Sequence, residues 1–202
     1  MAASSLLDLV GNTPLVELKR LAPSPSVRLY AKLEGQNPSG SLKDRIAKAM
    51  VETAEACGEL QPGRELLEPT SGNTGISLAM VARIKGYRLT CVMPANATPE
   101  RRRLLELMGA SIVESPADEG TNGAVQMALR MAEGDSRYFM PFQYANDANV
   151  QAHYEGTGAE IAAELEEGVV VCVLADGGWK YLSAPFWAAE DVESAMENSV
   201  WW

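Results

Sequence analysis

The stretch VRLYAKLEGQNPSGSLKDRIAKAMVETAEACG, residues 27–58, contains three local patterns in a fixed order. Residues 27–34 are a short β-prone run, residues 35–41 are rich in turn-forming residues, and residues 42–58 carry helix-forming residues that end at a glycine. The stretch therefore predicts a strand, a loop and a helix.

Lys43 stands at the point where this loop becomes the helix. Ser41 and Asp44 have the spacing of a helix N-cap residue and an acidic residue in the first turn, which places Lys43 inside that turn. The positive end of the helix dipole disfavours a second positive charge there by roughly 0.3–1 kcal/mol. We therefore expect the Lys43 amine to be neutral more readily than an exposed lysine, and a neutral amine is a nucleophile. The alternative is that Lys43 is only a surface charge, as most lysines are.

The same order recurs along the chain. Strands are predicted at 64–70, 87–94 and 110–116, and helices from about 73 to 85, 98 to 109 and 119 to 133. Beyond these, residues 141–147 resemble a loop, 152–168 a helical stretch and 169–176 a buried strand. Alternation of this kind is typical of an α/β fold, with parallel sheets and flanking helices.

Composition excludes several classes of protein. The 202 residues carry a net charge of -10, which argues against nonspecific binding to nucleic acid. Cys57, Cys91 and Cys172 are widely separated and His153 is the single histidine, so neither a disulfide framework nor a metal site is indicated. The N-terminus does not resemble a signal peptide and nothing downstream is as long as a membrane span, which favours a cytoplasmic protein without membrane contacts.

A second loop, TSGNTG at Thr70–Gly75, also follows a predicted strand and opens a helix. Small residues let the backbone approach a ligand, and free N–H groups at a helix start bind anions such as a carboxylate. The alternative is that these residues only form a turn and a cap. Gln143 is a lone loop amide, and Gly156–Gly158 is a weak candidate for a phosphate cradle because it lacks the flanking pattern of a P-loop.

Several segments together resemble the pyridoxal-phosphate-dependent cysteine synthases, in order and in spacing. They are GNTPLVEL (11–18), KLEGQNPSGSLKDR (32–45), EPTSGNTGISLAM (68–80), GYRLTCVMP (86–94) and LMGASIV (107–113). HYEGTGAEI (153–161) and VLADGGWKYLS (173–183) are similar to the actinobacterial cysteine synthase B type, which uses O-phosphoserine and a thiocarboxylated sulfur-carrier protein. The resemblance covers about residues 6–183 and implies a fold-type II, tryptophan synthase β-like architecture.

The resemblance also implies roles for individual residues. Lys43 would form the Schiff base with pyridoxal phosphate and later carry the proton, and Asn73 would contact the cofactor's 3-hydroxyl. Substrate binding would fall to Thr70, Ser71, Asn73, Thr74 and Gln143. The implied enzyme is a transferase of cysteine biosynthesis that replaces the β-substituent of O-phosphoserine or O-acetylserine with sulfur from sulfide or a carrier thiocarboxylate. A homodimer is expected.

The chain is shorter than the family pattern requires. Around Leu165–Gly168 the sequence passes from the family's early helix to its last strand, and omits the loop that grips the cofactor phosphate, the turn facing the pyridine nitrogen and the arginine associated with phosphoserine. We therefore expect residues 44–145 to form the smaller substrate-binding domain, and 1–43 with 146–202 to be a remnant of the larger cofactor domain. Cofactor binding should be weakened by this internal deletion.

Two alternatives follow from that departure. The chain could be a non-catalytic, truncated homologue that acts as an interaction module. It could also be a serine or threonine dehydratase, which shares the lysine and the carboxylate loop, although the ADGGWKYLS ending at 175–183 argues against this.

Overall fold

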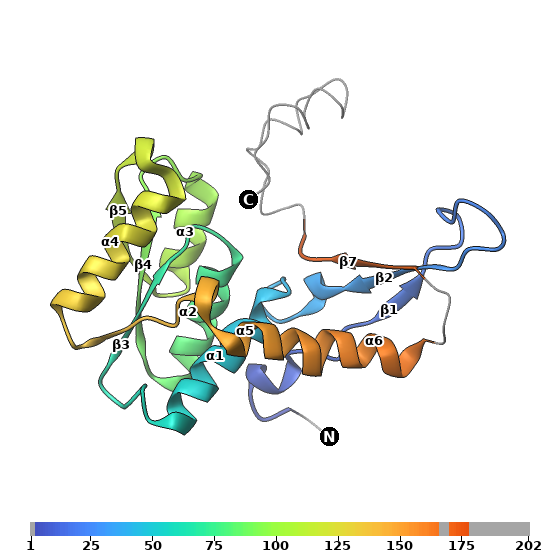
Figure 1. Cartoon of the computed structure of the whole chain (residues 1–202), viewed down its shortest axis with the longest axis horizontal. Helices are drawn as coiled ribbons and strands as arrows, with labels where there is room; N and C mark the ends of the chain where they lie inside the picture. Colours follow the sequence, from blue (N-terminus) through green and yellow to red (C-terminus); the bar gives the residue numbers. More distant parts are fainter. Residues whose placement is uncertain (1–2, 166–169, 178–202) are drawn as a thin grey trace.

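The computed structural model of the protein describes residues 3–165 and 170–177. Two sheets lie at opposite ends of an elongated molecule (Figure 1). In spatial order, the larger sheet consists of β5 (Ser111–Ser115), β4 (Arg88–Pro94), β3 (Glu65–Pro69) and β6 (Tyr138–Phe139), and the smaller of β1 (Leu15–Glu17), β2 (Leu29–Leu33) and β7 (Val170–Leu174). Residues 178–202, including most of the predicted GGWKYLS segment, lie outside the described part of the chain.

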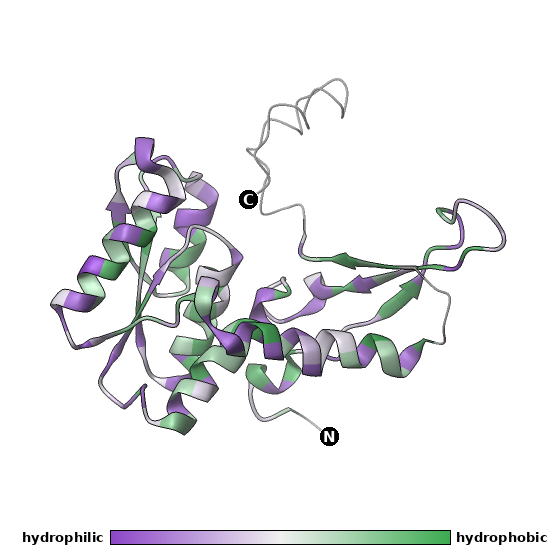
Figure 2. Ribbon diagram, viewed as in Figure 1, coloured by the Kyte–Doolittle hydropathy of each residue, from purple (hydrophilic) through white to green (hydrophobic). Residues whose placement is uncertain are grey.

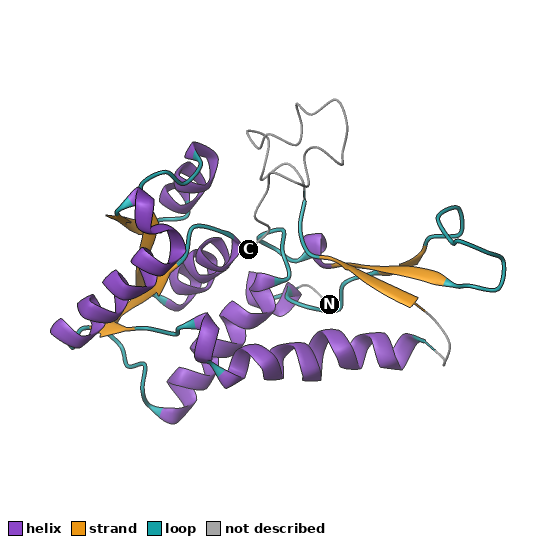
Figure 3. Ribbon diagram, turned by 45° about the horizontal axis from the view of Figure 1, so that its top comes forward, coloured by secondary structure: helices purple, strands orange, loops and turns teal. Residues whose placement is uncertain are grey.

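The helices follow the predicted alternation closely. They are α1 (Lys43–Cys57), α2 (Asn73–Lys85), α3 (Pro99–Leu107), α4 (Gly120–Gly134), α5 (Asp147–Ala152) and α6 (Ala159–Glu164). A π-helical segment, η5 (His153–Gly158), joins α5 to α6 in one continuous rod (Figure 3). The remaining short 3-10 turns are η1 (Leu6–Leu9), η2 (Glu34–Gln36), η3 (Ala117–Glu119) and η4 (Gln143–Ala145).

Every neighbouring strand pair of the larger sheet is parallel, as the sequence predicted. One face of this sheet packs on α1 and α2 through a large apolar cluster that includes Leu66 and Met93. The other face packs on α4, where Leu67 and Val92 meet Ala124. Residues 74–82 of α2 are all buried because this helix lies between α1 and the sheet. The apolar colouring of Figure 2 follows the same inner surfaces.

Two glycines end the helices that carry the site. Gly58 after α1 and Gly86 after α2 have φ of 81° and 82°, and their backbone N–H groups bond back to the last helical turn. Glycine adopts this left-handed conformation without the steric cost that a Cβ brings. The predicted ends of both helices are confirmed.

The smaller sheet is mixed. β2 pairs in parallel with β7, with Ala31 opposite Cys172, and antiparallel with β1, a strand that the sequence pattern did not predict. β7 is an edge strand, and Val173 and Leu174 are each 48% exposed. The rod formed by α5, η5 and α6 runs alongside this sheet (Figures 1 and 3).

The N-cap predicted at Ser41 is wrong, because Leu42 occupies the cap position, whereas Asp44 and Lys43 lie in the first turn as predicted. Ser41 Oγ accepts the backbone N–H of Lys43 at 3.2 Å. Asp44 accepts the backbone N–H of Ser39 at 2.7 Å and the hydroxyl of Ser77 at 2.5 Å. The carboxylate is drawn to these donors because they belong to the loop and to α2, which pack on the same side of α1.

Candidate functional site

Two loops meet at the centre of the molecule, and each leaves the carboxyl end of a strand and enters a helix. Residues 34–42 connect β2 to α1, and residues 70–72 connect β3 to α2. Ligands of open α/β folds bind at such strand ends. The structure therefore places both predicted loops where a ligand site belongs.

Lys43 is the first residue of α1 and is half-buried. Burial lowers the pKa of its amine, because removal of water disfavours the charged form. The direction agrees with the sequence prediction, and desolvation is a cause that the sequence did not indicate. The single histidine, His153, lies inside the continuous rod, and burial together with the charge of Lys43 lowers its pKa.

Asp44 links the first turn of α1 to the first turns of α2 by hydrogen bonds. Its carboxylate accepts hydrogen bonds from the hydroxyls of Ser39, in the first loop, and Ser77, one turn into α2. Ser39 and Ser77 are themselves 3.1 Å apart. All three side chains are buried, so the first turns of α1 and α2 are held together by a polar contact that water does not reach.

The loop Thr70–Gly75 folds back on itself and on the chain near residue 143. Thr70 Oγ1 accepts the backbone N–H of Gly72 at 3.3 Å, and Thr74 Oγ1 donates to Oε1 of Gln143 at 2.6 Å. The structure thus brings together Thr74 and Gln143, two of the predicted site residues that lie 69 positions apart. Ser71 and Asn73 are partly exposed on the same loop.

Gly75 is required by space. A Cβ at this position would lie 2.8 Å from Cγ2 of Thr70 and 3.0 Å from Cδ2 of Leu105. Because this glycine has no side chain, the first turn of α2 approaches β3 and α3 closely. The last glycine of the TSGNTG motif is therefore a packing residue.

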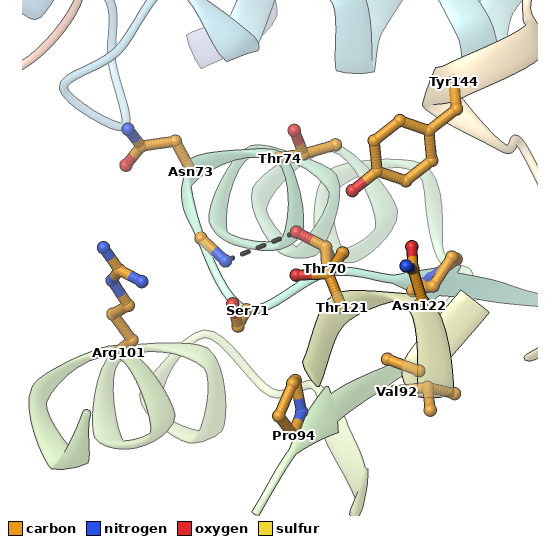
Figure 4. A pocket seen from close by; sticks show the side chains of 13 residues that line it. Thr70, Ser71, Asn73, Thr74, Val92, Pro94, Arg101, Thr121, Asn122 and Tyr144 are labelled. Carbon is orange, nitrogen blue, oxygen red and sulfur yellow. Dashed lines mark hydrogen bonds between the residues drawn. The ribbon is translucent and has the colours of Figure 1, made fainter. Parts of the chain in front are cut away.

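A pocket of about 430 Å³ lies beside this loop, between α3 and α4. Figure 4 shows Arg101 reaching toward the loop from α3, and Thr121 and Asn122 facing it from the start of α4. Tyr144 lies on the side of Asn122, away from Arg101 (Figure 4). The arginine triplet at 101–103 had the sequence pattern of a solvated helix face, and that pattern did not indicate this pocket.

The segment after β7 contacts both loops. Asn73 Nδ2 donates to Oδ2 of Asp176 at 2.5 Å, and the backbone N–H of Leu42 donates to the carbonyl of Ala175 at 2.9 Å. Ser41 and Asp176 also form an isolated β-bridge. Asp176 was not identified from the sequence, because the pairing of β7 with β2 that brings it to the site is a long-range contact.

An ionic network centres on Arg45, which is buried on α1 two residues after Lys43. Arg45 donates to both oxygens of Glu34, at 2.8 Å each, and to both oxygens of Glu160, at 2.6 and 2.7 Å. Lys32 Nζ lies 2.9 Å from Glu160 and donates to the backbone carbonyl of Thr13 at 2.7 Å. Burial works against the charge of Arg45, but hydrogen bonds to Glu160 and Glu34 outweigh it and raise its pKa.

The Gly-Thr-Gly at 156–158 belongs to this network and not to a phosphate cradle. It lies within the π-helical segment η5, and a Cβ on Gly156 would lie 3.0 Å from Nη1 of Arg45. The glycine lets the rod approach the guanidinium. The weak resemblance to an anion nest is thus replaced by a packing role.

Two further features bear on the class of protein. Within residues 3–165 and 170–177, no three His, Cys, Asp or Glu side chains gather in a way that could hold a metal ion. Among the helices of that same part, none combines the length and the apolar character needed to cross a membrane.

Comparison with known proteins agrees with the fold and with the motifs. The family model described as "Pyridoxal-phosphate dependent enzyme" matches residues 6–183. A cysteine synthase B of Pseudomonas syringae pv. syringae is 49% identical over 78% of this chain and 92% of that protein, and a cysteine synthase of a Flavobacterium species is 44% identical over 88% and 58%. A crystal structure of a cysteine synthase from Entamoeba histolytica superposes with a TM-score of 0.76 at 35% identity, over 81% of this chain and 50% of that one.

These matches define the class. The chain belongs to the pyridoxal-phosphate dependent enzyme family and has cysteine synthase homologues, and its α/β, fold-type II architecture is confirmed by the solved structure that it resembles. It spans 58% of the Flavobacterium protein and half of the Entamoeba chain.

Proposed function

We propose that the chain is a cysteine synthase that exchanges the β-substituent of an activated serine for sulfur, with pyridoxal phosphate as its cofactor. The observation that carries this proposal is the polar contact between Asp44 and Ser77, which fastens the helix bearing Lys43 to the helix that opens at Asn73. An amine and a carboxylate-binding loop are thereby held at one place. The homologues named above supply the reaction class.

The cofactor fits one side of this site. Lys43 offers a half-buried amine, and burial lowers its pKa. A lowered pKa favours the neutral amine, which is the form that attacks a carbonyl. Asn73 offers an amide suited to the cofactor's hydroxyl, and in this structure that amide bonds to Asp176. When bound, pyridoxal phosphate supplies an electron sink for the electron pair of the substrate's Cα–H bond.

The substrate carboxylate would lie at the start of α2. Thr70, Ser71 and Thr74 carry hydroxyl donors, and the start of α2 adds the positive end of the helix dipole. Gln143 joins them through its bond to Thr74. In the proposed reaction the Lys43 amine takes the Cα proton and returns it to the same carbon, while the Cβ–O bond breaks and a Cβ–S bond forms.

We further propose the domain division expected from the sequence, with residues 44–145 as the substrate-binding domain and 1–43 with 146–202 as the remnant of the cofactor domain. The larger sheet lies wholly within 44–145, and the smaller sheet draws its strands from the two flanking parts, which supports this division. An internal deletion near Leu165–Gly168 is compatible with the half-length matches. The Gly-Thr-Gly that is described lies inside η5, so it leaves the cofactor phosphate without a cradle there.

Finer assignments are proposals of the same kind. The O-phosphoserine type and a sulfur-carrier partner rest on the motifs at 153–161 and 173–183. A homodimer is supported by the exposed apolar edge of β7, which another chain can cover. A cytoplasmic location agrees with three free cysteines among the described residues.

Absorbance of the purified chain with added pyridoxal phosphate tests the proposal. We expect a violet band that Lys43→Ala abolishes and that Lys19→Ala, at an exposed position, leaves in place. Formation of L-cysteine from O-phosphoserine or O-acetylserine should follow the band. Absence of the band in excess cofactor overturns the proposal, and release of pyruvate alone points to a dehydratase.

One observation favours a second candidate function. Because the chain spans about half of the Flavobacterium and Entamoeba proteins, it is also consistent with a non-catalytic homologue that pairs with other chains through its sheet edge. Co-purification with an intact homologue, without a violet band, would favour this candidate.

A further inference from the structure

Glu68 is fully buried near the end of β3, two residues before the loop Thr70–Gly75. Its carboxylate accepts two consecutive backbone N–H groups from the segment that follows β6. Oε2 accepts the N–H of Phe142 at 2.8 Å, and Oε1 accepts the N–H of Gln143 at 3.0 Å. Both oxygens of one buried carboxylate are therefore occupied by one short piece of backbone.

The backbone at Phe142 has an unusual conformation. Its φ of 52° and ψ of 74° fall in the left-handed region, which is disfavoured for residues with a side chain. Successive N–H groups in such a turn point to the same side, which is the geometry in which backbone binds an anion. Glu68 supplies that anion and so stabilises a conformation that the sequence alone does not favour.

This conformation decides where Gln143 lies. Its side-chain Oε1 accepts the hydroxyl of Thr74 at 2.6 Å, in the first turn of α2. Its backbone carbonyl accepts Nδ2 of Asn149 at 2.9 Å. Gln143 is thus held by Glu68 through its backbone N–H, by Asn149 through its backbone carbonyl, and by Thr74 of the loop Thr70–Gly75 through its side-chain amide.

The chemistry of the contact requires a carboxylate. An ionised carboxylate only accepts hydrogen bonds, so each oxygen can face one N–H group. A glutamine of nearly the same shape can present one oxygen, and its amide nitrogen would oppose the second N–H. Burial of a charge is costly, and this geometry gives it a structural reason.

We infer that Glu68 is a positioning residue, which holds the backbone of Phe142 and Gln143 so that the Gln143 amide meets Thr74 at the substrate loop. The part that concerns substrate binding rests on the proposed function of Gln143. The arrangement of the backbone does not.

The protonation of Glu68 gives this inference a measurable signature. Burial raises the pKa of Glu68 to about 7, although its bonds to Gln143 and Phe142 lower it. A protonated carboxyl is a weaker acceptor than a carboxylate. Cys91, the register partner on β4, and Tyr144 on η4 respond to the charge of Glu68, and burial raises the pKa of both, so they stay neutral near pH 7.

Amide hydrogen exchange of the full chain, without cofactor or substrate, tests the inference. We expect Glu68→Gln to speed exchange at Phe142 and Gln143 by about tenfold or more, as for loss of a bond to a charged acceptor. The matched control is Glu65→Gln, since Glu65 is also buried on β3 but accepts the Thr90 hydroxyl at 2.6 Å. The control should leave both amides unchanged. Equal exchange in wild type and Glu68→Gln overturns the inference.

The wild-type chain provides a second test that does not depend on the variant's folding. After correction for intrinsic rates, the protection of the Phe142 and Gln143 amides should rise several-fold between about pH 6 and pH 8. The protection of amides within the strands should stay constant. Flat protection over this range overturns the inference.

If the chain makes cysteine, Glu68→Gln should raise KM for the amino-acid substrate more than it lowers kcat, and an unchanged KM refutes the link to substrate binding. A wild-type chain without cysteine synthase activity refutes only the proposed function, because the exchange experiments use no cofactor.

Discussion

Arg45 on α1 and Glu160 on α6 lie 115 positions apart in the sequence and form a bidentate ion pair with N–O distances of 2.6 and 2.7 Å. Glu34 occupies the other side of the same guanidinium. One cation therefore joins the end of β2, the helix of Lys43 and the long rod. Since this guanidinium is almost fully buried, its removal takes away the cation that pairs with Glu34 and leaves Glu160 with Lys32, at 2.9 Å.

We expect Arg45→Met to lower the free energy of unfolding by about 3–5 kcal/mol, the usual cost of breaking a buried ion pair from one side. Arg137→Met is the matched control, because both side chains of the Arg137 pair with Asp135, at 2.8 Å, are exposed, and such pairs contribute roughly 0–1 kcal/mol. Urea unfolding monitored by circular dichroism measures both. A loss for Arg45→Met no larger than that of the control would contradict the role of the network.

Glu160 should make the stability of the chain depend on acid pH. Hydrogen bonds from Arg45 lower the pKa of Glu160 to about 2, from an ordinary value of 4.5. A depressed pKa means that the folded state favours the carboxylate, so the contribution is present above about pH 4.5 and is lost as the pH falls toward 2. The difference in unfolding free energy between wild type and Glu160→Gln should be largest near neutrality and shrink on acidification. A difference that does not vary with pH would argue against the assigned pKa.

Lys43 should cost stability at neutral pH. Because burial lowers the pKa of its amine, the folded state disfavours the charged form that dominates in the unfolded chain. We expect Lys43→Met to stabilise the chain at pH 7, with a gain that shrinks as the pH rises toward the pKa of an unfolded lysine. Lys19→Met, at an exposed position, should change little. Urea unfolding at several pH values measures the gain, and a destabilised Lys43→Met would contradict the desolvation argument.

Gly75→Ala should be destabilising by about 1–3 kcal/mol, as for other overpacked positions, because the new methyl group would lie 2.8 Å from Cγ2 of Thr70. Gly72→Ala is the control within the same loop, since nothing lies within 4 Å of the place its new methyl group would take and its φ is negative. Thermal and urea unfolding compare the two variants. Similar stability of both would show that the first turn of α2 can move away from β3.

Much of the fold is local in origin and could be predicted. Helices α1 and α2 end at Gly58 and Gly86, where the sequence supplies a residue that tolerates a positive φ. β3 and β4 are buried along almost their whole length because both faces of the larger sheet are covered. β6 is only two residues long, and its pairing with β3 at Glu65 is set by tertiary contacts.

The site was predictable in part for the same reason. The two loops follow strands and open helices, so their residue types indicate a ligand-binding role from the sequence alone. Asp176, Glu68 and the partners of Arg45 were not identified, because each acts through contacts between distant segments. Asp44 lies in the first turn of α1 as predicted, but the sequence did not identify its donors on Ser39 and Ser77.

The π-helical segment η5 lies between α5 and Glu160, so the number of residues in η5 sets the direction in which Glu160 points. Each residue added to or removed from a helix rotates everything beyond it by about 100°. A single insertion or deletion between His153 and Gly158 would therefore turn Glu160 away from Arg45, while substitutions at positions other than Gly156 and Gly158 would leave its direction unchanged. Apart from these two glycines, the stretch should tolerate changes of residue type far better than changes of length.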